Sequence, residues 1–154
     1  MKSIIKPKEG DVFAVPLRHG DFGIGLLTHK HKSITLGYFF NLVYDTIPSN
    51  VEASMFDRSN VVLIGKFSSL GIESGEWQLL KTSYQFKKED WNIPTFKMQN
   101  PLTEKYFAVV YDETLINEDR YLITEEEARL LFSHGLYGYG ALEKKLSSIL
   151  GDLN

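Results

Sequence analysis

The chain has 154 residues, of which 43% are hydrophobic and 13% aromatic, so it can form one packed domain over residues 1–154 and is not a disordered chain. It has no cysteine, which excludes disulfides and thiolate chemistry. It has no apolar run long enough for a signal peptide or a membrane-spanning helix, which predicts a cytoplasmic location. Its net charge of −3 is too small to indicate a partner, so the distribution of charge along the chain is more informative.

The first part of the chain predicts an antiparallel meander of three strands joined by short turns, at residues 11–17, 22–28 and 34–42. The first strand is apolar on both faces, which indicates burial on both sides. Pro16 cannot donate to a ladder, so one side is free near the strand end or a bulge occurs there. In the second strand, Gly23 and Gly25 share a face, where a ring or another backbone must come close. Such glycines are typical of strands that coil in small barrels.

Beyond this meander, the sequence predicts shorter strands separated by loops. Residues 45–59 are rich in turn-forming residues and read as a loop, and residues 83–105 as a long polar and aromatic excursion. The further strands are expected at residues 60–67, 77–80, 95–98, 105–112 and 120–123.

The C-terminal part changes to a helical period. Thr124 and Glu127 fit a capping box, and an apolar stripe continues to Phe132 before Gly135 ends this helix. A second helix is expected over residues 141–150. Its apolar face consists of Leu142, Leu146, Ile149, Leu150 and Leu153. The fold class is therefore α+β and mainly β: an antiparallel, strongly coiled sheet or small partly open barrel with two C-terminal helices.

Negative charge gathers in the last third of the chain. Residues 101–154 carry ten Asp and Glu against five Lys and Arg, and residues 111–127 hold seven acids against Arg120 alone. Such a stretch disfavours nucleic acid and favours a basic protein partner, although it also fits a solvated surface with an acidic helix start. The predicted partner contacts are Asp112, Glu113, Glu118, Asp119, Glu125 and Glu126.

No arrangement of residues indicates catalysis, a metal or a cofactor. His29 and His31 are two apart and could share a strand face, but no third ligand is marked nearby and the adjacent lysines repel cations. His134 reads as the end of a helix, where a partial positive charge suits the dipole. Adjacent carboxylates on a strand point to opposite faces, and no nucleophile signature occurs. We therefore expect a protein that is not an enzyme.

Two alternatives remain open from the residues alone: an enzyme with an unrecognised site and, as the main alternative, a nucleic-acid-binding small β-barrel. Tyr38, Phe39 and Phe40 lie on a predicted strand beside Lys30 and Lys32, and this combination could stack single-stranded bases. The same aromatic residues equally fit the core of a small sheet protein.

Three segments together resemble the immunity protein 26 family of bacterial polymorphic toxin systems: residues 10–17 (GDVFAVPL), 22–25 (FGIG) and 137–143 (YGYGALE). The resemblance spans about residues 8–145. It implies a mostly β, non-catalytic protein that binds and neutralises a cognate toxin, often a nuclease, encoded beside it. The residues shared through this resemblance look structural: Gly10, Asp11, Pro16, Gly23 and Gly25. Residues that contact the toxin vary with the partner and are not transferred by it.

Overall fold

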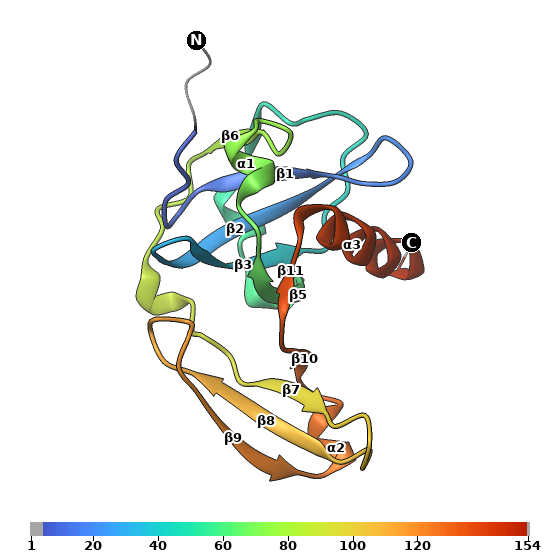
Figure 1. Cartoon of the computed structure of the whole chain (residues 1–154). Helices are drawn as coiled ribbons and strands as arrows, with labels where there is room; N and C mark the ends of the chain where they lie inside the picture. Colours follow the sequence, from blue (N-terminus) through green and yellow to red (C-terminus); the bar gives the residue numbers. More distant parts are fainter. Residues whose placement is uncertain (1–4, 154) are drawn as a thin grey trace.

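The computed structural model describes residues 5–153, with side chains for residues 5–151. It contains two sheets and one long C-terminal helix, α3 (Tyr139–Leu153), as Figure 1 shows. The strand order of the seven-stranded sheet is β11 (Leu136–Tyr137), β5 (Val61–Phe67), β3 (Ile34–Phe40), β2 (Phe22–His31), β1 (Val12–Pro16), β6 (Leu79–Thr82) and β4 (Asn50–Val51). The order of the four-stranded sheet is β10 (Phe132–Ser133), β7 (Phe96–Gln99), β8 (Tyr106–Tyr111) and β9 (Glu118–Ile123).

The class α+β, mainly β, is confirmed, whereas the barrel is wrong. Over residues 5–153 neither sheet closes or curls, and the small sheet extends away from the large one (Figure 1). The antiparallel meander of β1, β2 and β3 is confirmed. The sheets as a whole are mixed, because β4 pairs with β6, β11 with β5 and β10 with β7 in parallel. These two-residue strands arrive through long connections, which parallel pairing requires.

β2 is longer than predicted and its turn into β3 is tighter, whereas β1 and β3 are each two residues shorter than predicted. β2 continues through the basic residues to His31, so only Lys32 and Ser33 form the turn into β3. Lys32 takes a φ of 54°, the left-handed conformation that two-residue hairpins favour. β6 pairs with β1 only at Val12 and Phe13, so the end of β1 at Pro16 is free on one side, as predicted.

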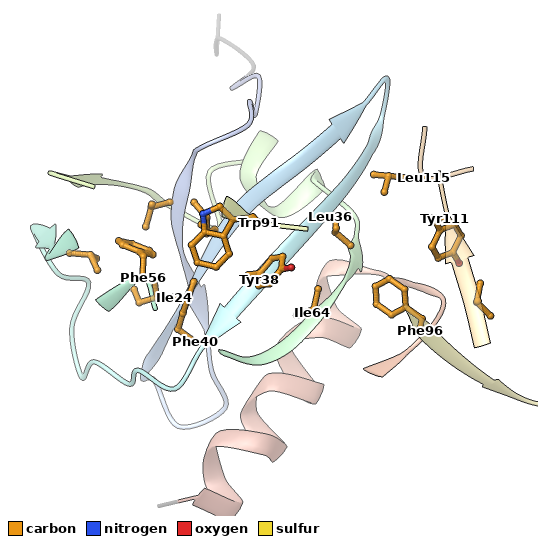
Figure 2. Close-up of a cluster of buried hydrophobic side chains, with 14 residues drawn as sticks. Ile24, Leu36, Tyr38, Phe40, Phe56, Ile64, Trp91, Phe96, Tyr111 and Leu115 are labelled. Carbon is orange, nitrogen blue, oxygen red and sulfur yellow. The ribbon is translucent and has the colours of Figure 1, made fainter. Parts of the chain in front are cut away.

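Alternating side chains of the large sheet enter two cores, one on each face. On one face, Ile24, Leu36 and Tyr38 pack with Trp91 of the excursion and with Phe96 of the small sheet, as Figure 2 shows. This core therefore joins the two sheets.

The opposite face carries an aromatic cluster covered by helices. The rings of Phe13 and Trp77 stack with their centroids 5.5 Å apart, and Phe39 meets Phe13 edge to face. Leu142 and Leu146 of α3 pack on this core. Burial on both faces explains why β1 is apolar throughout.

Gly25 makes the aromatic cluster possible. A Cβ added at this position would lie 2.5 Å from the ring of Phe13 and 2.9 Å from that of Phe39. The predicted close approach of a ring is confirmed, but it serves the packing of an open sheet and not the coiling of a barrel wall.

The first predicted helix is mostly wrong, although its start is right. In α2 (Glu125–Ala128), the Thr124 hydroxyl accepts from the Glu127 N–H at 3.1 Å and the Glu127 carboxylate accepts from the Thr124 N–H at 3.1 Å, which confirms the capping box. The helix ends after one turn because Phe132 leaves it to pair with β7 and to pack between the cores. His134 consequently does not end a helix, and its backbone N–H donates to the Lys97 carbonyl at 2.9 Å.

The second predicted helix is α3, which begins two residues earlier and ends three later than expected. Leu142, Leu146 and Leu150 are buried and Ile149 is half-buried, as the periodicity predicts. The side chain of Leu153 lies outside the described residues. None of the helices in residues 5–153 is long and apolar enough to cross a membrane. Short helices elsewhere are α1 (Leu70–Glu73), η1 (Ala53–Met55), η2 (Arg58–Asn60) and η3 (Lys88–Asp90).

We expect Gly25→Ala to lower the free energy of unfolding by about 1–3 kcal/mol, because the new methyl group overlaps two buried rings. Gly140→Ala in α3 is the matched control. A Cβ there meets nothing within 4 Å and should stabilise the helix by about 0.5–1 kcal/mol. Urea unfolding of both variants measures the difference, and shifts of equal sign would contradict this account of Gly25.

Candidate functional site

The six acidic residues predicted as partner contacts lie along the β9 edge of the small sheet, and all are exposed. Asp112 and Glu113 belong to the turn between β8 and β9, Glu118 and Asp119 begin β9, and Glu125 and Glu126 begin α2. At a rise of about 3.3 Å per residue, β9 separates the turn from α2 by about 20 Å. The acids therefore form a line along β9, here called the acidic edge (Asp112, Glu113, Glu118, Asp119, Glu125 and Glu126).

Asp112 has a structural role in this line. Its carboxylate accepts from the Thr114 N–H at 3.0 Å, from the Thr114 hydroxyl at 2.5 Å and from the Asn117 amide at 3.0 Å. These hydrogen bonds, those from Thr114 first, lower the pKa of Asp112. The carboxylate thus fixes the conformation of the β8–β9 turn.

Two further acids of the edge have basic partners within the chain. Glu118 accepts from Arg120 at 2.6 Å, and these side chains share one face of β9. Glu125 lies 3.7 Å from Arg129, one helical turn later, where both side chains are exposed and the ion pair is weak. Both contacts reduce the negative charge that a partner meets.

The remaining three acids are available to a partner. The side chains of Glu113, Asp119 and Glu126 form no hydrogen bond or ion pair with any residue that the structure describes. They occupy the turn, the strand and α2 respectively, so free negative charge is present along the whole acidic edge.

Exposed apolar side chains lie beside these acids, and the sequence did not predict their exposure. Tyr121 is 53% exposed and Leu122 is 60% exposed, on opposite faces of β9. Val110, which pairs with Asp119 across the strands, is also partly exposed. The sequence predicted a strand at residues 120–123. Tyr121 and Leu122 point to opposite faces, so a strand with one buried face would hide one of them, whereas both are exposed here.

A lysine from the large sheet holds the β8–β9 hairpin in place. The Lys66 ammonium of β5 lies 4.1 Å from the centroid of the Tyr111 ring and donates to the Leu115 carbonyl at 3.2 Å. Tyr111 and Leu115 both belong to the core shared by the sheets, as Figure 2 shows. Burial lowers the pKa of Lys66, while the charge of Glu118 acts in the opposite direction. The acidic edge is therefore carried by a hairpin with a fixed position.

His29 and His31, two residues apart in β2, gain no third metal ligand from the residues that the structure describes. His29 is buried with its Nδ1 2.9 Å from the Thr28 hydroxyl, and it lines a hollow at the junction of the sheets together with Lys88 and Glu113. Within the described part of the chain, no three His, Asp or Glu side chains come together in a way that could hold a metal ion.

The aromatic residues of β3 are not available to nucleic acid. Tyr38, Phe39 and Phe40 are all buried in the two cores. The Tyr38 hydroxyl donates to the Asn92 carbonyl at 2.5 Å, so this side chain is held inside the protein. The observation that favoured a base-stacking surface is thereby removed.

Comparison with known protein families identifies a match. A family model described as immunity protein 26 matches residues 8–108, which is more than half of the chain. The matched region includes residues 10–17 and 22–25, two of the segments that carry the resemblance, and leaves residues 137–143 outside. Neither a curated protein nor a solved structure matches the chain.

His29 is expected to make stability depend on pH. Burial is the main cause that lowers its pKa below 6.5, Lys88 adds to it, and Glu9 and Glu113 oppose it. As pH falls below the unfolded value of 6.5, the unfolded chain binds a proton that the folded chain still excludes, so the free energy of unfolding decreases until the lower folded pKa is reached.

As pH is lowered from about 7.5 to about 5, the free energy of unfolding should therefore decrease less for His29→Gln than for the parent chain. Urea unfolding across this range measures the effect. Above this range the stability difference between the two chains should be constant, which provides the control. Parallel pH profiles throughout would show that His29 is not responsible.

Proposed function

Because this chain belongs to the immunity protein 26 family, we propose that it neutralises a nuclease toxin by binding the toxin's basic surface through the acidic edge. Membership of the family implies toxin neutralisation, and such proteins bind cognate toxins and are typically non-catalytic. The proposal adds the class of toxin, the surface that binds it and the cytoplasm as the place of action.

The observation that carries the proposal is the free negative charge of Glu113, Asp119 and Glu126 along one exposed edge. A nuclease binds phosphate groups and so presents a positively charged surface. A complementary negative surface raises the rate of encounter and selects against partners of like charge. The lack of internal partners matters because these carboxylates need not break an existing ion pair to bind.

The boundaries of the family match support this assignment. The match ends at residue 108 within β8, and every residue of the acidic edge lies beyond it. A surface that recognises one particular toxin is expected outside the region common to the family. The large sheet, by contrast, lies mostly within the matched region and forms the scaffold.

The fixed position of the hairpin also favours binding. Lys66 and the shared core hold Tyr111 and Leu115, so β9 needs little ordering when a partner arrives. Preorganisation of this kind lowers the entropy cost of association.

Reversal of charge on the acidic edge should slow binding of the toxin. We expect Asp119→Lys with Glu126→Lys to lower the association rate constant about tenfold or more at low salt, and to flatten its dependence on salt. Surface plasmon resonance with the purified, catalytically inactive toxin domain encoded beside this chain measures both quantities.

The matched control carries Glu52→Lys with Glu76→Lys, which changes the net charge equally at exposed residues in loops of the large sheet. This control should retain most of the association rate. Equal losses in the two double variants, or no loss in either, would contradict the assignment of the acidic edge.

Co-expression tests the class of toxin. The parent chain should restore growth to cells that produce the active toxin domain, and that domain alone should degrade cellular DNA or RNA. Rescue of growth from a toxin that leaves nucleic acids intact would retain the immunity function and refute the nuclease.

A further inference from the structure

β9 is the outermost strand of the small sheet, and we propose that an extended basic segment of the toxin binds it as a fifth strand. This inference rests on the proposed function and deepens it by stating how the acidic edge binds. In Figure 1, β9 lies on the outer side of β8, and no other strand of residues 5–153 pairs with it.

The backbone of β9 offers a row of free hydrogen-bonding groups. The Asp112 N–H donates to the Asn117 carbonyl at 3.0 Å. This hydrogen bond determines which residues of β9 turn their backbone groups toward β8 and which turn them outward. In an antiparallel pair, every second residue turns its N–H and C=O toward the neighbour. Asp119 and Tyr121 therefore turn theirs toward β8, whereas Glu118, Arg120 and Leu122 turn theirs outward. Within the described chain, these outward groups have no backbone partner.

The edge lacks most of the features that block strand addition. Native edges are commonly protected by proline, a bulge, a covering segment or charge. β9 contains no proline and pairs with β8 without a register shift over all six residues. Tyr121 and Leu122 are exposed on its two faces. Of the protective features, only charge is present.

That charge decides which strand can bind. A second copy of β9 would bring only one basic residue, Arg120, which already pairs with Glu118 of its own strand, so Asp119 would meet no free counter-charge. A basic strand supplies that counter-charge instead. The occupant is therefore a segment of the toxin and not another copy of this chain.

The order of side chains along β9 also specifies the incoming strand. Glu118 and Asp119 lie at one end on opposite faces, and Tyr121 and Leu122 lie at the other end on opposite faces. Directly opposed residues interact across neighbouring strands, where opposite charges or apolar pairs are favourable. The segment should thus have Lys or Arg in one half and apolar residues in the other.

Residue-resolved amide exchange by NMR tests the proposal, with the catalytically inactive toxin domain encoded beside this chain as the probe. Binding should slow exchange about tenfold or more at Glu118, Arg120 and Leu122, and change it little at Asp119 and Tyr121, which β8 already protects. Binding without this alternation would overturn strand addition. The proposed function would still stand if charge reversal on the acidic edge slows association.

A pair of variants at one position isolates the backbone contribution. Leu122→Ala and Leu122→Pro both remove the side chain, but only proline also removes the outward N–H, which an edge strand tolerates. We expect Leu122→Pro to bind the toxin domain about tenfold more weakly than Leu122→Ala.

Circular dichroism and thermal unfolding establish that both variants retain the parent fold. Equal affinities of the two folded variants would overturn the proposal. If Leu122→Pro does not fold, the amide exchange pattern of the parent chain decides whether the toxin segment binds as a strand. A toxin domain that the parent chain does not bind at all would instead refute the proposed function.

Discussion

The arrangement of this protein depends on one short segment that belongs to both sheets. Phe132 pairs with Phe96 of the small sheet, and five residues later Tyr137 pairs with Phe67 of the large sheet. The turn between them uses Gly135, whose φ of 123° is open to glycine. Because the segment is hydrogen-bonded at both ends, it leaves little freedom for the small sheet to move. Phe132 packs against both cores and adds an apolar contact at the same point.

The large sheet is a scaffold whose surfaces are already occupied. One face meets the small sheet and the excursion that carries Trp91, and the other meets α3 and the aromatic cluster around Phe13. A sheet covered on both sides has little area left for a partner. β9, the exposed strand of the small sheet, therefore offers free groups to a partner. Lys66 and Phe132 fix the position of the small sheet.

Whether a feature of this fold could be predicted from the sequence depends on how far apart in the chain the interacting residues lie. The meander and the capping box depend on neighbouring residues, and both were predicted. The helix expected to reach Gly135 depends instead on Phe132, whose pairing partner Phe96 is 36 positions earlier, and no local pattern reveals it. The acids of the edge were identified from composition. Tyr121 and Leu122 were missed because the edge position of β9 follows from strand order and not from its own residues.

The separation between scaffold and exposed strand has a consequence for the evolution of specificity. The folding of the large sheet rests on buried contacts that few substitutions can preserve. The outward side chains of β9 and the first turn of α2 touch little of that core, so changes there cost little stability. Under the proposed mode of binding, a lineage that meets a new toxin can change the exposed residues of β9 and of the first turn of α2 while the rest of the protein stays the same.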